Sequence, residues 1–82
     1  MQFLSICYVE ELKKEEILKS FGTHLKKIRN EKKISLRVLE QLSNVDYSQI
    51  HRIEKGETAP SLITLISLAK GLGIHPKDLL GF

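Results

Sequence analysis

The chain has 82 residues, which is enough for one domain but leaves little room for an enclosed active site beside a core. Its 41% apolar and 28% charged residues are typical of a soluble globular domain, and no apolar run approaches the roughly 20 residues that cross a bilayer. The net charge of +3 is too small to identify a partner. These properties therefore exclude a membrane protein and little else.

The first nine residues, MQFLSICYV, are rich in strand formers and do not share the helical period of the residues that follow. We expect them to be frayed or to form an extended arm. An arm this apolar is costly to leave in water. We therefore expect four of its side chains to pack against the domain or across a dimer: Phe3, Leu4, Ile6 and Tyr8.

The same segment bears on the cellular compartment. It lacks the basic region and the small-residue cleavage site of a signal peptide. Cys7 is the only cysteine, which excludes an internal disulfide and suits a reducing environment. The sequence therefore predicts a cytoplasmic protein.

A helical pattern follows the apolar segment. Apolar residues recur at steps of four, four and three, at Ile17, Phe21, Leu25 and Ile28. Charged residues flank this stripe throughout. The pattern predicts a first helix from about residue 11 to residue 33, with the stripe facing the core.

The start of a second helix is marked by Ser35, whose hydroxyl can accept an unpaired backbone N–H of the first helical turn. Ile34 and Leu39 have the spacing of a hydrophobic staple around this cap. Asn44 tolerates the left-handed conformation of a tight turn, so the helix should end near Ser43. The predicted buried face consists of Val38, Leu39 and Leu42.

A third helix should begin only two or three residues later. Asp46 has the position of an N-cap, and Gln49 lies three residues on, which is the spacing of a capping box. Val45 and Ile50 form a second staple. The predicted inward residues are Ile50 and Ile53, and Gly56 is the expected stop.

Two further helices complete the chain. Ser61 is the expected cap of a fourth helix that ends at Gly73, with an inward stripe of Leu62, Leu65, Ile66, Ala69 and Leu72. The last, short helix has a staple, a cap, a first-turn proline and a staple partner at Ile74, His75, Pro76 and Leu79. Five helices and no convincing strand predict an all-α domain.

Residues 35–55 carry the functional signal, because two short helices joined by a turn this tight can present the second helix to a DNA major groove. The outer face of that second helix is polar, with Tyr47, Ser48, Gln49, His51 and Arg52. Glutamine can pair with adenine, arginine with guanine, and serine with either. Residues 24–55 also carry eight basic and four acidic side chains, a balance of +4 that suits a polyanion or a solvated helix face.

From about residue 21 to residue 80, three quarters of the chain, the sequence resembles the Cro/C1-type (XRE-like) helix-turn-helix family of phage repressors and bacterial regulators. The most specific match is the run Arg52-Ile53-Glu54-Lys55-Gly56. Other matches include Gly22, Ile34-Ser35, Val45-Asp46, Pro60-Ser61, Leu68-Ala69 and Leu72-Gly73-Ile74. The resemblance implies a compact five-helix bundle of the lambda-repressor-like type over residues 21–82, with residues 1–20 as an arm and the start of the first helix.

The resemblance also implies roles for individual residues. The positions that match base-reading residues are Tyr47, Ser48, Gln49 and Arg52. Those that match phosphate contacts are Ser35, Leu36, Arg37, Lys55 and Thr58. Leu36 stands where the family usually has glutamine, so only its backbone N–H could make that contact. Arg29 and Glu54 match an ion pair that joins the first helix to the third.

The implied function is sequence-specific binding of double-stranded DNA by a transcriptional regulator, most often a repressor, acting as a homodimer on a palindromic site. The fourth and fifth helices are the expected dimer seam. A phage-type repressor, a restriction-modification controller and an antitoxin all fit the pattern. The alternative from another class is a protein-interaction module that uses the third helix to bind a protein.

An enzyme is not expected, because the sequence has no paired carboxylates, phosphate loop or nucleophile with an adjacent base. His24, His51 and His75 lack the spacing of zinc ligands, so no metal site is expected. No cofactor or small-molecule ligand is indicated either.

Overall fold

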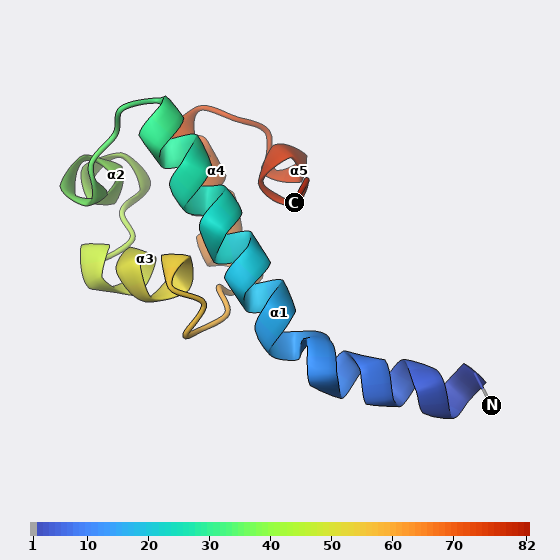
Figure 1. Ribbon diagram of the computed structural model, residues 1–82. Helices are drawn as coiled ribbons and strands as arrows, with labels where there is room; N and C mark the ends of the chain where they lie inside the picture. Colours follow the sequence, from blue (N-terminus) through green and yellow to red (C-terminus); the bar gives the residue numbers. More distant parts are fainter. Residues whose placement is uncertain (1) are drawn as a thin grey trace.

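The computed structural model describes the backbone of residues 2–82 and the side chains of residues 13–82. Over this part the chain forms five helices and no strand: α1 (Gln2–Glu31), α2 (Leu36–Ser43), α3 (Tyr47–Glu54), α4 (Leu62–Leu72) and α5 (Pro76–Leu79). The prediction of an all-α, five-helix domain is confirmed. Helix α1 crosses the domain, with α2 and α3 on one side of it and α5 on the other (Figure 1). None of the described helices combines the length and the apolar character that a membrane crossing requires.

Helix α1 begins at Gln2, so the predicted start near residue 11 and the frayed or extended segment before it were wrong. The residues before Gly22 include no proline or glycine, and nothing in their backbone chemistry interrupts a helix. The side chains of Phe3, Leu4, Ile6 and Tyr8 lie outside the described residues, and their packing stays a prediction.

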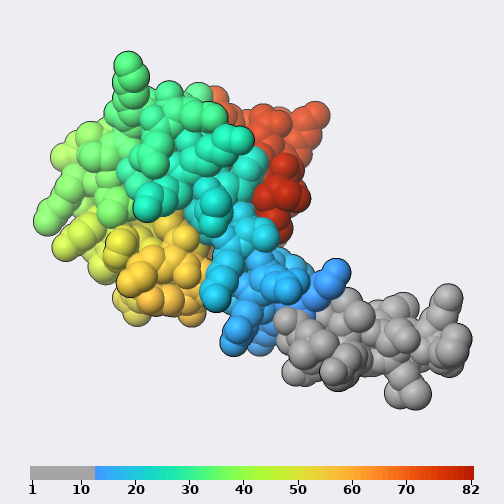
Figure 2. Space-filling model, in the orientation of Figure 1, coloured from blue at the N-terminus to red at the C-terminus, as the bar shows by residue number. Residues whose placement is uncertain are grey.

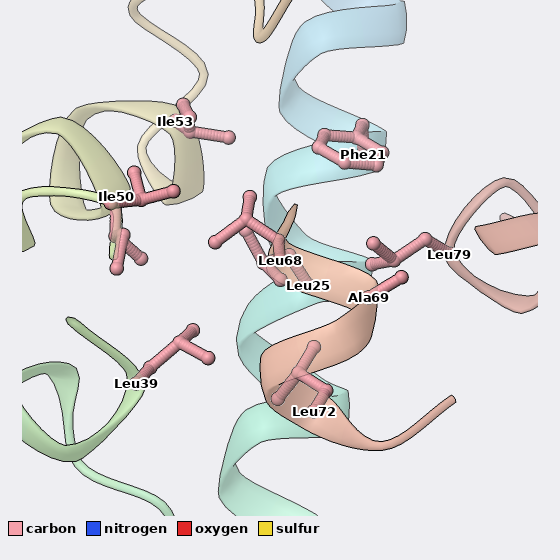
Figure 3. Packing of buried hydrophobic residues seen from close by; sticks show 10 residues of the cluster. Phe21, Leu25, Leu39, Ile50, Ile53, Leu68, Ala69, Leu72 and Leu79 are labelled. Carbon is pink, nitrogen blue, oxygen red and sulfur yellow. The ribbon is translucent and has the colours of Figure 1, made fainter. Parts of the chain in front are cut away.

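The core lies where all five helices meet, and Figure 3 shows its side chains pointing toward one another. Its buried members are Phe21, Leu25, Leu39, Val45, Ile50, Ile53, Leu68, Ala69, Leu72 and Leu79. Ile17 of the predicted first stripe is 51% exposed, because it precedes the part of α1 that the other helices cover. Ile28 is partly buried and packs against the core, as predicted.

The inward face of α4 differs from the predicted stripe. Leu62 and Ile66 are exposed, whereas Leu68, which the prediction omitted, is fully buried. Helix α4 carries apolar residues on more than one face, so its periodicity alone does not select the buried one. The selected face is the one that packs against α2 and α5.

The buried face of α2 was also predicted incorrectly in part. Leu39 is buried, but Val38 and Leu42 are exposed, and Ser43 is buried in their place. The reason lies in α4, where a side-chain carbon added at Gly71 would lie 2.9 Å from the Cβ atom of Ser43. Small residues on both helices therefore permit a close approach along the Leu39–Ser43 side of α2.

The predicted caps of α2 to α5 are confirmed. Side chains of Ser35, Asp46, Ser61 and His75 each accept a backbone N–H in the first turn of the helix that follows. Asn44 and Gly73 adopt the left-handed conformation directly after α2 and α4, with φ of 65° and 72°. These short-range interactions fix where each helix begins and ends, and so they fix the length of every connection.

Candidate nucleic-acid interface

A rigid turn of three residues, 44–46, joins α2 to α3. The buried hydroxyl of Ser43 donates to the carbonyl of Leu39 (2.6 Å) and accepts the N–H of Val45 (3.2 Å). Val45 is itself buried in the core, and Asp46 caps α3. The turn is therefore held at both ends, so α3 has a fixed direction relative to α2.

Helix α3 is divided into an inner and an outer face. Ile50, Ile53 and Glu54 are buried. The outer side chains are exposed at Tyr47, Ser48, His51 and Arg52, while Gln49 is half-buried. Figure 2 shows the atoms of α2 and α3, green to yellow, on one exposed side of the molecule. Four side chains that the sequence associated with base reading thus lie on one short helix whose opposite face is anchored.

An ion pair ties the end of α3 to α1. The Nε and Nη2 atoms of Arg29 donate to the two carboxylate oxygens of Glu54, at 2.6 and 3.0 Å. The Nη1 atom of Arg29 also donates to the carbonyl of Ile34 at 2.9 Å. Both side chains of the pair are almost fully buried. The structure thus brings together the two residues expected to pair, and it uses them as a structural clamp.

Close backbone contact reinforces this clamp. A side-chain carbon added at Gly22 would lie 2.4 Å from the carbonyl oxygens of both Ile53 and Glu54. Only glycine leaves room for α3 to approach α1 this closely. The position of α3 therefore depends on the backbone of α1 as well as on its side chains.

The first turn of α3 contains a polar network. The carboxylate of Asp46 accepts the N–H of Ser48 at 3.1 Å and also accepts the Ser48 hydroxyl. The hydroxyl bond, followed by the backbone bond, lowers the pKa of Asp46 below its ordinary value. Because the Ser48 hydroxyl proton is directed to Asp46, the Ser48 oxygen remains available as an acceptor.

The side chains expected to contact phosphate come from two places. Ser35 caps the start of α2, and the side chain of Leu36 packs against the core, so only the backbone N–H of Leu36 is available there. At the other end of the unit, the exposed Lys55 directly follows α3. Its Nζ atom lies 3.4 Å from the Oε2 atom of Glu57. Thr58 in the loop beyond is half-buried.

Arg37, the remaining expected phosphate contact, lies against an expected base reader. Its guanidinium carbon is 4.3 Å from the centroid of the Tyr47 ring. This contact joins the first turns of α2 and α3. Sequence reasoning missed it because no helical spacing rule links residues on two different helices.

One hollow of the described surface borders this unit, lined by residues 41–44 of α2 and the turn and by Ser67 and Lys70 of α4. An open hollow of about 420 Å³ is lined by α1 residues and the C-terminal residue, namely Lys19, Ser20, Thr23, His24, Lys27 and Phe82. Within residues 13–82, no three His, Cys, Asp or Glu side chains are grouped closely enough to hold a metal ion. The polar face of α3 is therefore the strongest candidate for a binding site.

A family model for the helix-turn-helix matches residues 25–79, which contain α2, the turn and α3. This chain belongs to the helix-turn-helix family. The matched part of the chain is therefore a DNA-binding domain of the type found in transcriptional regulators, a family of binding domains rather than enzymes.

Individual relatives agree with this assignment. The helix-turn-helix chain is 39% identical over 64 residues to an uncharacterized HTH-type transcriptional regulator from Haemophilus influenzae. The match covers 78% of this chain and 65% of that relative, so it spans slightly less than two thirds of the relative's length.

Solved structures show the same fold. The restriction-modification controller protein C.AhdI from Aeromonas hydrophila superposes with a TM-score of 0.73 at 34% identity, over 78% of this chain and 96% of the controller. The clp gene regulator ClgR from Corynebacterium glutamicum superposes with a TM-score of 0.72 at 28% identity, over 78% and 83% of the two chains. The lambda-repressor-like arrangement predicted from the sequence is thus confirmed.

Proposed function

We propose that this helix-turn-helix protein regulates transcription by binding a specific sequence in double-stranded DNA, with α3 in the major groove. One observation carries the proposal: α3 has an anchored inner face and an outer face of exposed polar side chains. A helix of this diameter fits the major groove, where each base pair presents a distinct pattern of donors and acceptors. DNA as the partner implies a cytoplasmic site of action.

The residue types on α3 suit direct reading of bases. Arg52 can donate two hydrogen bonds to guanine, and Gln49 can exchange two with adenine. Because the Ser48 hydroxyl donates its hydrogen bond to the Asp46 carboxylate, its oxygen can only accept one from DNA. This favours an amino group on the base that faces Ser48. Tyr47 offers its ring edge and its hydroxyl.

Two groups of phosphate contacts would set the depth and direction of α3. The first turn of α2 supplies the Ser35 hydroxyl, the backbone N–H groups of residues 36 and 37, and the Arg37 guanidinium. The other end of the unit supplies Lys55 and Thr58. Such contacts orient a protein on the duplex without reading its sequence.

Selection of binding sites from randomised duplex DNA tests this proposal. We expect the wild-type protein to enrich one sequence and an Arg52→Ala variant to lose enrichment at one base pair of it. Enrichment of no sequence, with only weak and strongly salt-dependent binding, would contradict the proposal. That outcome would favour a protein-interaction module.

We further propose that the protein acts as a homodimer on a palindromic site. Large apolar side chains are exposed on α4, at Leu62, Ile63 and Ile66, and after α5, at Leu80 and Phe82. Monomeric domains rarely leave large apolar patches in water, and a second copy is a matching partner for such a patch. Two-fold symmetry would place the two α3 helices in half-sites about one helical turn apart.

Sedimentation velocity tests the dimer. We expect the wild-type protein to sediment as a dimer and Ile63→Glu to sediment as a monomer, because a buried carboxylate is costly. Leu42→Glu is the control, since Leu42 is also a large apolar residue with more than half of its surface exposed, but it lies on α2. A dimer that survives Ile63→Glu would exclude this part of α4 from the seam.

Repression is the regulatory outcome we propose. A protein bound to a promoter blocks polymerase access most simply by covering it. The similarity to a controller protein and to a gene regulator supports a regulatory role. A reporter gene carrying the selected site should be expressed less when the protein is present, and increased expression would contradict repression.

A further inference from the structure

Arg37 and Tyr47 form a stacked contact between the two helices of the DNA-binding unit. Arg37 is the second residue of α2, and Tyr47 is the first residue of α3. The guanidinium carbon lies 4.3 Å from the ring centroid, and both residues are exposed. Among residues 13–82, the Arg37 guanidinium takes part in no ion pair, so its charge is not neutralised by a neighbouring carboxylate.

The chemistry of this contact leaves both groups able to bind DNA. A guanidinium over an aromatic ring is attracted by the negative charge of the ring face. Its N–H groups lie at the edge of the guanidinium plane, and they remain available to phosphate oxygens. The ring in turn has one face covered by Arg37, while its edge and hydroxyl stay accessible.

We propose that Arg37 is a specificity-determining positioning residue: it binds a backbone phosphate and, through the stack, holds the Tyr47 ring for contact with a base. The inference rests on the proposed DNA-binding function. A phosphate ligand alone would contribute affinity without sequence preference. Because Arg37 also holds Tyr47 in place, it contributes to the discrimination between DNA sequences without contacting a base itself.

Lys55 provides the matched comparison. It is an exposed cation proposed to contact phosphate, and it forms an ion pair with Glu57, which lies outside α3. Arg37→Gln and Lys55→Gln each remove one positive charge. Each should lower the slope of log Kd against log salt by about 0.9. Only Arg37→Gln should also reduce the affinity ratio between the selected site and a site substituted at the base pair facing Tyr47.

A double-mutant cycle on DNA affinity tests the coupling. We expect Arg37→Gln to weaken binding about three- to tenfold more in the wild-type background than in the Tyr47→Leu background, because the exposed cation–π contact should strengthen when DNA excludes water from it. Lys55→Gln should weaken binding equally in both backgrounds. Tyr47→Phe keeps the ring and should preserve the coupling, and circular dichroism checks that each variant is folded.

The free protein offers a readout that is independent of DNA. The Tyr47 ring resonances in an NMR spectrum should shift on Arg37→Gln and stay in place on Lys55→Gln. Additive affinities in both cycles, with the wild-type protein still selecting a sequence, would overturn the inference and leave the proposed function intact. If the wild-type protein selects no DNA sequence, both the inference and the proposed function are overturned.

Discussion

Arg29 and Glu54 are the two charged residues that the described part of the domain buries. Each carboxylate oxygen of Glu54 accepts one N–H from Arg29, and the remaining guanidinium nitrogen reaches the carbonyl of Ile34. No buried side-chain nitrogen or oxygen of residues 13–82 lacks a partner. Removing either side chain would leave the other as an uncompensated buried charge.

We therefore expect Arg29→Ala to lower the free energy of unfolding by about 3 to 5 kcal/mol, the usual cost of breaking a buried pair. Urea denaturation followed by circular dichroism measures this change. The control is Glu57→Gln, which breaks the exposed pair with Lys55 and should cost less than about 1 kcal/mol. An Arg29→Ala protein that melts at the wild-type temperature would contradict the structural role of the pair.

The carboxylate of Asp46 should make the stability of the domain depend on pH. The Ser48 hydroxyl, followed by its N–H, lowers the pKa of Asp46 in the folded protein. A lowered pKa stabilises the folded state above the ordinary aspartate value of about 4, and that contribution disappears as the pH falls through the lowered pKa. In an NMR titration, Ser48→Ala should raise the pKa of Asp46. Identical titration curves for the two proteins would contradict this network.

At the scale of elements, the packing of α1 against α3 depends on Gly22. Alanine usually stabilises a helix interior relative to glycine by about 0.5 to 1 kcal/mol. Here the added carbon would lie 2.4 Å from two backbone carbonyl oxygens, which cannot move aside as a flexible side chain could. The free energy lost through this clash should be larger than the free energy gained from the higher helix propensity of alanine.

Gly22→Ala is therefore expected to destabilise the domain by about 1 to 3 kcal/mol, as overpacked cores usually do. Thermal unfolding measures the effect. Gly81→Ala is the matched control, because its added carbon would lie 3.5 Å from the nearest neighbouring atom, an ordinary contact. Equal melting temperatures for the two variants would show that α1 and α3 can separate without cost.

Helix ends were more predictable from the sequence than helix faces. The caps at Ser35, Asp46 and Asn44 depend on residues two to four positions away, so the local sequence contains the information. The buried face of α2 depends on how closely α4 can approach, and Gly71 decides this from 28 residues beyond Ser43. The helical periodicity of α2 could not show whether the buried side contains Val38 and Leu42 or Leu39 and Ser43.

The site was predictable to a similar degree. The sequence correctly placed Tyr47, Ser48 and Arg52 on the exposed face of α3, because the apolar residues of that helix define its inner side. The engagement of Ser48 by Asp46 and the position of Arg37 over Tyr47 were not predicted. Both depend on side-chain conformation, and the second depends on the angle between two helices.

At the scale of the whole molecule, the core and the proposed DNA surface use different residues. Among the side chains of residues 13–82, the ten buried apolar ones lie between Phe21 and Leu79. The apolar segment at the start of the chain comes before all of them in the sequence, and its predicted role is to pack against the domain or across the dimer.

Deleting residues 1–9 should change the oligomeric state seen by sedimentation or lower the melting temperature, because an apolar segment of this composition is costly to expose. The remaining chain should still unfold cooperatively, since it retains every core residue described between Phe21 and Leu79. A truncated protein with an unchanged oligomeric state and unchanged stability would contradict the predicted packing of Phe3, Leu4, Ile6 and Tyr8.

The central claim is that exposed side chains of α3 read base edges. Fluorescence anisotropy tests it most directly, with wild-type and Arg52→Ala proteins titrated against the selected duplex and every single base-pair substitution of it. We predict that Arg52→Ala loses about 1 to 3 kcal/mol of discrimination at one base pair and keeps the wild-type profile elsewhere. A uniform loss of affinity across all duplexes would mean that Arg52 contacts only the phosphate backbone, and would contradict the claim.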